Sequence, residues 1–119
     1  MECMVNENVI VHVTPGNYWE NAKAKHYFLP ESLKRNGYIS CATEQQLADS
    51  AQFLYKDKLN QKILYIKQEK VTAQIVYEDI HETGQEFPHI YGALNVDAVI
   101  KVVDFKLSPS GQFDLPKLS

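Results

Sequence analysis

The stretch of residues 86–92, with the sequence EFPHIYG, constrains the fold of this chain more than any other. Pro88 fixes its own φ and moves the preceding residue toward extended backbone, so the stretch is predicted to form a β-strand. Side chains alternate along a strand, which places His89 and Tyr91 on one face and Ile90 on the other.

Glu86 complicates this strand, because the same alternation puts its carboxylate on the face opposite His89 unless a bulge beside the proline moves it. Two interpretations stay open. Either Glu86 is a solvated carboxylate and His89 and Tyr91 are half-buried strand residues, or the three side chains belong to one functional site.

Other runs rich in β-branched and aromatic residues also predict strands. These runs lie at residues 9–13, 38–42, 62–67, 74–80 and 99–105. Thr14 and Pro15 predict the start of a helix that ends before Pro30. Thr43 and Gln46 form a capping-box pattern that predicts a second helix, ending near residues 56–60. Residues 30–37 are predicted to form a turn. Helices early and strands late favour an α+β fold.

The chain has 119 residues, which predicts one domain, with a core over about residues 9–105 and a loosely held tail over 108–119. The net charge is −3 and the twelve Lys and Arg residues are scattered, which argues against a nucleic-acid ligand. Two cysteines, Cys3 and Cys41, are too few for a disulfide framework. Neither a signal peptide nor an apolar run of roughly 20 residues is present. We therefore expect a cytoplasmic protein that does not associate with a membrane.

His12 and the segment from Ser40 to Thr43 are further candidates for a site. His12 is the one polar residue in a Val and Ile run, so its ring either bonds within the core or opens into a pocket. Ser40 to Thr43 lead from a predicted strand into a helix N-terminus, which attracts anionic groups.

Other chemistries have less support in the sequence. The four histidines lack the close spacing of zinc sites, so no metal ion is expected. Ser40 or Cys41 could act as a nucleophile with His12 or His89, but neither lies in a nucleophile-elbow motif.

Two strings, GYISCAT at residues 37–43 and EFPHIYGAL at residues 86–94, resemble a known family when taken together with VHVT at residues 11–14 and Trp19. This is the bacterial family called domain of unknown function 952, whose members read YHIT, GFIHCST and FPHIYGPL. The match covers about residues 9–105. Ser40 departs from the pattern by replacing a histidine, and Ala42 departs from it by replacing a serine.

That family is similar in fold to the ADP-ribosyltransferases and the RNA 2′-phosphotransferases, which have a cleft for NAD. The resemblance implies an ADP-ribosyltransferase-like split β-sheet core with two short helices in the N-terminal half. It implies that His12 contacts the nicotinamide ribose and that Ser40, Thr43 and Tyr91 help to bind the nucleotide. Glu86 would be the catalytic carboxylate, and His89 would act as an acid or base.

Three functions follow, and the sequence leaves all three open. NAD, as substrate or ligand, would lose nicotinamide by ADP-ribosyl or phosphoribosyl transfer or by glycohydrolysis, through a transition state with positive charge on the ribose carbon. The same fold could instead be a non-catalytic module for ligand binding or for interaction with a partner, which the replacement at Ser40 favours. The third function is a hydrolase that uses His12, His89 and a water or metal.

Overall fold

The computed structural model describes residues 8–48, 61–80 and 82–105, and within them the fold is α+β with antiparallel strand pairs. The first sheet has the order β1–β4–β8 and the second has the order β3–β6–β5. The strands of these sheets are β1 (Val9–Pro15), β4 (Gln61–Lys67), β8 (Val99–Asp104), β3 (Ile39–Ser40), β6 (Phe87–Tyr91) and β5 (Gln74–Glu78). A separate short pair joins β2 (Tyr27–Phe28) to β7 (Leu94–Asn95). The helices are α1 (Gly16–Lys23), α2 (Glu31–Asn36), the described helical residues 44–48, and the 3₁₀ turns η1 (Gln68–Lys70) and η2 (Val96–Ala98).

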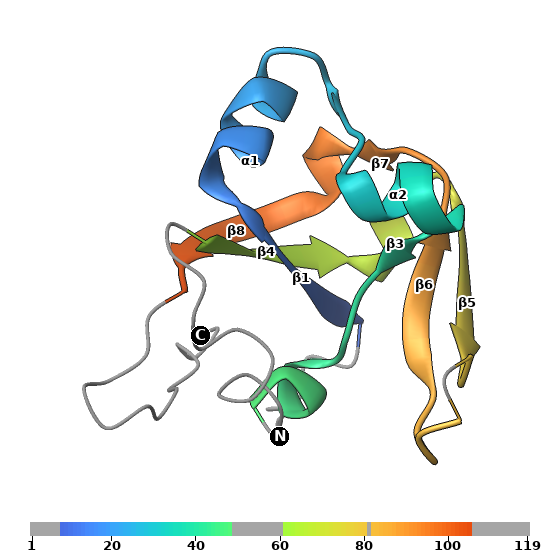
Figure 1. Ribbon diagram of the computed structural model, residues 1–119. Coiled ribbons are helices and arrows are strands. Elements are labelled where there is room, and N and C mark those ends of the chain that lie inside the picture. The colour runs from blue at the N-terminus through green and yellow to red at the C-terminus, as the bar shows by residue number, and fades with distance from the viewer. Residues whose placement is uncertain (1–7, 49–60, 81, 106–119) are drawn as a thin grey trace.

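One bridge between Val11 and Ala42 joins the two three-stranded sheets edge to edge. The Val11 N–H donates to the Ala42 carbonyl at 2.7 Å, and the Ala42 N–H donates to the Val11 carbonyl at 2.9 Å. The strands therefore follow one another in the order β8–β4–β1–β3–β6–β5, as a curved surface beneath α1 and α2 (Figure 1).

Each face of this curved sheet packs its own set of apolar side chains. On the face toward α1, Ile10, Leu64 and Ile90 are fully buried against Trp19 of the helix. The opposite face packs a second cluster, whose buried members include Val11, Ile63 and Tyr65 of the sheet and Leu47 of the helical residues 44–48. We call these the α1 face and the opposite face. Strict alternation along β1 and β6 decides which of the two each polar residue reaches.

The predicted helix start at Thr14 is wrong. Thr14 lies inside β1, no side chain caps α1, and the helix begins only at Gly16, after Pro15. Strand pairing wins here because the Thr14 backbone is opposite Lys62 in the β1–β4 ladder. The Thr14 hydroxyl is buried and has no hydrogen-bond partner among the described residues.

The turn predicted over residues 30–37 is also wrong, because Glu31–Asn36 forms the short helix α2. Gly37 ends this helix with a φ of 85°, the left-handed conformation that glycine adopts without strain. The Asn36–Gly37 signal thus marked a helix end rather than a hairpin. The predicted strand over residues 38–42 is shorter than expected and continues past Ser40 as the bridge at Ala42.

Pro88 occupies β6, the central strand of its sheet, where proline is usually excluded because it lacks an N–H donor. The Cys41 N–H donates to the Pro88 carbonyl at 3.0 Å, so the main-chain polar groups of Pro88 point toward β3. Since β3 ends at Ser40, the N–H that Pro88 lacks would lie just beyond the end of the β3–β6 ladder. Pro88 therefore stiffens the strand without breaking a regular pair.

No helix among the described residues is long and apolar enough to cross a membrane. The predicted tail at residues 108–119 and the end of the predicted second helix lie outside the described residues.

Two glycines with positive φ give a direct test of this packing. A Cβ on Gly92 (φ 154°) would lie 3.0 Å from the Ala73 Cβ, whereas one on Gly84 (φ 89°) would meet nothing within 4 Å. We expect Gly84→Ala to lower the free energy of unfolding by about 1 kcal/mol, from backbone strain alone. Gly92→Ala should lower it by about 3 kcal/mol, because strain and crowding combine. Urea denaturation measures both variants, and equal losses would contradict the close packing at Gly92.

Candidate functional site

Four side chains from three adjacent strands or their ends gather on the opposite face, and we call them the acid–base cluster: Tyr38, Glu78, His89 and Tyr91. His89 and Tyr91 share this face because Ile90, between them, is buried on the α1 face. The sequence-based expectation for these two side chains is therefore confirmed.

One carboxylate oxygen, Oε2 of Glu78, organises this cluster. It lies 2.8 Å from His89 Nδ1, and it also accepts a hydrogen bond from the Tyr91 hydroxyl. The hydrogen bonds from Tyr91 and His89 hold the pKa of Glu78 below its ordinary value. The bond to Glu78 raises the pKa of Tyr91 to about 12. The pair thus keeps a carboxylate ionised beside a phenol that stays neutral.

Tyr38 covers the imidazole of His89. The two rings stack with centroids 4.1 Å apart and 18° between their planes, and Tyr91 lies tilted against Tyr38 at 5.4 Å. His89 is 3% exposed as a result, whereas Tyr91 is 39% exposed. The cluster therefore presents one open aromatic ring and one partly exposed carboxylate to solvent, above a buried imidazole.

Ser40 lies directly opposite His89 in the β3–β6 pair, and its side chain is exposed. Because Cys41 and Pro88 form the hydrogen-bonded pair of this ladder, Ser40 and His89 form the non-bonded pair, in which side chains are closest. The structure thus brings the predicted residue Ser40 next to His89 and Tyr91.

His12 faces the other way. Its Nδ1–H donates to the Ser40 carbonyl at 2.7 Å. On the α1 face, its ring packs edge to face with that of Phe28, with ring centroids 5.6 Å apart. Burial lowers the pKa of His12 to about 4, against a smaller opposing effect of the bond to Ser40. His12 and His89 thus flank Ser40 from opposite faces of one sheet, and their rings do not share a cavity wall.

Thr43 and Glu86 form a third group, connected through Gln46. The capping box is confirmed: the Thr43 N–H donates to Gln46 Oε1 at 3.0 Å, and the Gln46 N–H donates to Thr43 Oγ1 at 3.1 Å. Gln46 Nε2 then donates to the Glu86 carbonyl at 2.8 Å. The Glu86 side chain is exposed one residue before β6, and no hydrogen bond joins its carboxylate to the described residues.

Sequence reasoning missed Glu78 and Tyr38. Glu78 precedes a loop and looked like an ordinary end of a strand, and Tyr38 looked like the first residue of one. The antiparallel pairing of β5 with β6 would have indicated Glu78. This pairing sets Val76 opposite His89, and Glu78, two residues after Val76, lies on the same face of the sheet as His89.

Two further observations concern a cysteine nucleophile and a metal site. Cys41 is buried on the α1 face, and burial raises the pKa of its thiol far above the ordinary value, so little thiolate forms. Among residues 8–48, 61–80 and 82–105, no group of three or more His, Cys, Asp and Glu side chains is placed to hold a metal ion.

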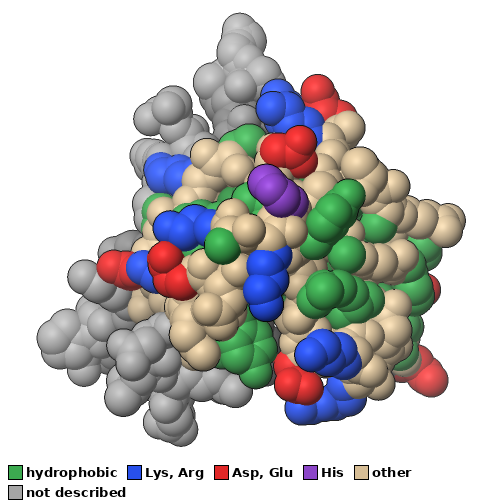
Figure 2. All heavy atoms as spheres, turned by 90° about the horizontal axis from the view of Figure 1, so that it is seen from above, with side chains coloured by type: hydrophobic (Ala, Val, Ile, Leu, Met, Phe, Trp, Pro, Cys, Tyr) green, Lys and Arg blue, Asp and Glu red, His purple; other side chains and the backbone are tan. Residues whose placement is uncertain are grey.

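The structure also has a pocket of about 350 Å³ between α1, β2 and α2. It lies on the α1 face, away from the acid–base cluster, and Phe28 both lines it and touches His12. Figure 2 looks onto this end of the molecule, where lysine or arginine side chains lie beside hydrophobic ones. This pocket and the acid–base cluster are therefore two separate places.

Comparisons with known proteins match this geometry to a family and a fold. The family model described as protein of unknown function (DUF952) matches residues 13–102. The crystal structure of protein CC0527 from Caulobacter crescentus is similar, with a TM-score of 0.77 and 23% identity over 89% of this chain and 93% of that one. A double mutant of CC0527 gives the same values, and its solution NMR structure gives a TM-score of 0.68 and 22% identity over 87% and 90% of the two chains. At this identity the likeness concerns the fold. None of the curated proteins compared with the chain matches it.

His12 gives a pH-dependence that can be measured. Its pKa falls from 6.5 to about 4 in the folded chain, so the unfolded state takes up the proton first as the pH drops. The stabilisation is complete above pH 6.5 and is lost between there and pH 4, by about 3 kcal/mol. Urea denaturation at pH 7 and pH 4 should show this loss in the wild type. His12→Asn keeps an N–H donor but cannot titrate, so it should lose about 3 kcal/mol less; equal losses would contradict the burial of a neutral ring.

Proposed function

The chain therefore belongs to the family of proteins of unknown function DUF952, and on that premise we propose that its acid–base cluster binds the ribose end of a nucleotide of the NAD or ADP-ribose type. We propose in addition that the curved sheet is a split core of the ADP-ribosyltransferase kind. The two three-stranded sheets, joined by the Val11–Ala42 bridge, support that assignment.

One observation carries the proposal: Glu78 Oε2 lies against both His89 and Tyr91. The carboxylate accepts the hydrogen on Nδ1 and so orients the imidazole, which leaves Nε2 to exchange a proton with a ligand. Because the pKa of Glu78 is lowered, its carboxylate is ionised and negatively charged at neutral pH. Such a charge stabilises the positive charge that develops on the ribose carbon when a glycosidic bond breaks.

In this proposal Glu78, rather than Glu86, is the catalytic carboxylate. Tyr91 has an exposed ring on which a nicotinamide or adenine ring would stack. The bond from the ribose carbon to nicotinamide would break, a water or hydroxyl oxygen would bond to that carbon, and His89 would accept the proton from the incoming oxygen.

Ser40 supports a second candidate function, binding without turnover. The family pattern has histidine at this position, directly opposite His89, so relatives would carry two imidazoles side by side on this face. This chain has a hydroxyl in place of the second imidazole. Loss of one acid–base group would leave the ligand site intact and lower the rate of any reaction there.

Binding is tested first, by thermal unfolding with NAD and with ADP-ribose. A ligand at a hundred times its dissociation constant should stabilise the fold by about 2.7 kcal/mol. Tyr91→Leu should weaken this stabilisation, because it removes both the exposed ring and a donor to Glu78. If neither nucleotide raises the unfolding temperature at millimolar concentration, the proposed function is rejected.

Turnover is then measured as nicotinamide released from NAD, detected by mass spectrometry. We expect Glu78→Gln to reduce release by at least about a hundredfold, since one preorganised charge is typically worth that much. Glu86→Gln should change it by less than about twofold, because Glu86 lies outside the cluster. Restoring the family residue with Ser40→His should raise the rate. The reverse ranking of the two glutamates would return the catalytic role to Glu86, and binding without release in the wild type and in Ser40→His would establish the second candidate.

A further inference from the structure

The pocket between α1, β2 and α2 lies on the α1 face, and the proposed function leaves it unused. Its volume of about 350 Å³ is at the lower end of the range for small-molecule sites. That volume admits one nucleotide rather than a dinucleotide. The side chains that line it are mainly aromatic and cationic, which limits the class of ligand.

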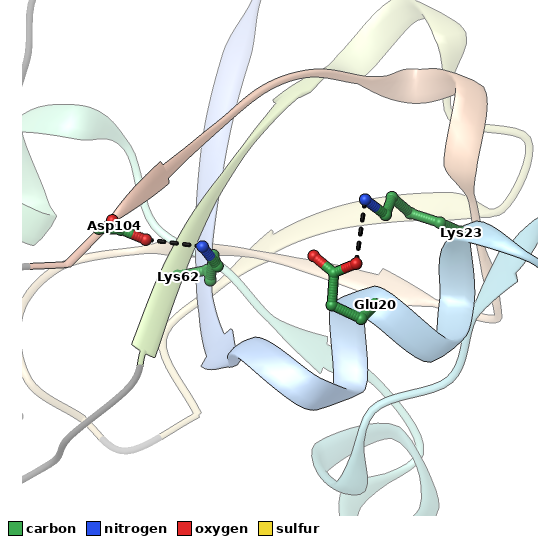
Figure 3. Close-up of polar contacts among 4 residues, drawn as sticks. All are labelled: Glu20, Lys23, Lys62 and Asp104. Atoms are coloured by element: carbon green, nitrogen blue, oxygen red, sulfur yellow. Dashed lines mark hydrogen bonds and ion pairs between the residues drawn. The ribbon is translucent and has the colours of Figure 1, made fainter.

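Two lysines line the pocket from different elements: Lys25 follows α1, and Lys34 lies in α2. Neither forms an ion pair with a residue in the described part of the chain. Two other lysines do: Lys23 pairs with Glu20 at 3.0 Å and Lys62 pairs with Asp104 at 2.6 Å (Figure 3). The pocket therefore holds two cations without a paired acid in a chain whose net charge is −3.

Aromatic side chains supply the rest of the lining. Tyr18 is 37% exposed and Tyr27 is 50% exposed, although tyrosine rings usually bury most of their surface. Both border the same hollow, together with the buried ring of Phe28 from β2. Partly exposed aromatic rings around one cavity are typical of a site for a planar ring.

We propose that this pocket binds a mononucleotide, with its base against Tyr18 and Tyr27 and its phosphate between Lys25 and Lys34. Lysine ammonium groups bind phosphate as point charges, and two of them match a dianion. Glu31, the acidic residue in the lining, accepts hydrogen bonds from ribose hydroxyls. This site is separate from the acid–base cluster, because Phe28 and Trp19 pack on the face of the sheet opposite His89.

Trp19 provides a signal for binding. It is the single tryptophan of the sequence, it is buried, and its ring lies 6.3 Å from that of Phe28. A base that enters the pocket contacts Phe28 and so changes the surroundings of Trp19. The fluorescence of Trp19 can be excited at wavelengths where adenine nucleotides do not absorb.

The experiment titrates the full-length protein with AMP, adenosine and ribose 5-phosphate while Trp19 fluorescence is recorded. AMP should give a saturable change, and the two fragments should bind at least about tenfold more weakly, since each lacks one half of the contacts. The double variant Lys25→Gln/Lys34→Gln should weaken AMP binding by about tenfold or more. Lys23→Gln is the matched control, since it removes a charge from α1 outside the pocket, and it should bind as the wild type does. Glu78→Gln should also leave AMP binding unchanged.

Three results would overturn the proposal. The first is the absence of a saturable signal with AMP together with no rise in unfolding temperature. The second is equal affinity for AMP in the wild type and in the double lysine variant. The third is loss of AMP binding in Glu78→Gln, which would assign AMP to the acid–base cluster instead. A failure here leaves the nicotinamide-release test of the cluster unaffected, because that test depends on Glu78 and NAD.

Discussion

The junction between β1 and the residues that follow β3 is the contact on which the rest of this structure depends. Two backbone hydrogen bonds between Val11 and Ala42, and one from the His12 ring to the Ser40 carbonyl, connect the two sheets there. Because a carbonyl only accepts, the His12 ring carries a hydrogen on Nδ1. Burial keeps this ring neutral by lowering its pKa, so the fold that contains the junction is most stable at neutral pH and loses stability in acid.

This junction also fixes where the acid–base cluster and the pocket at Phe28 lie relative to one another. It makes the strands one continuous surface, so that each residue of β1, β3 and β6 must face either α1 or away from it. His12 and the pocket at Phe28 fall on one face, and Ser40, His89 and Glu78 fall on the other. The pocket and the acid–base cluster therefore lie on opposite faces of the sheet and do not overlap. A chain this size has few alternatives, since most of its apolar residues are needed for the two cores.

Within the acid–base cluster, the decisive feature is that one oxygen of Glu78 accepts both of its partners. A His and a Tyr on alternate positions of β6 would otherwise be two independent side chains. Their shared acceptor couples them: a proton change at His89 alters the bond that holds Tyr91, and the reverse. The stacked ring of Tyr38 limits how far the imidazole can rotate. The result is a preorganised group of the kind that acid–base chemistry requires.

The local features of the fold follow from the amino-acid sequence alone. Alternation placed His89 and Tyr91 together, the capping box at Thr43 and Gln46 was read correctly, and the strings around Ser40 and His89 identified the family. These succeed because they depend on residues only a few positions apart. The sequence could not determine that Thr14 stays in a strand, that Glu78 rather than Glu86 meets His89, or that His12 faces the other side of the sheet. Those outcomes depend on strand pairing across 11 to 28 residues, as the Glu78–His89 and His12–Ser40 bonds show, and only the tertiary structure fixes which strands lie side by side.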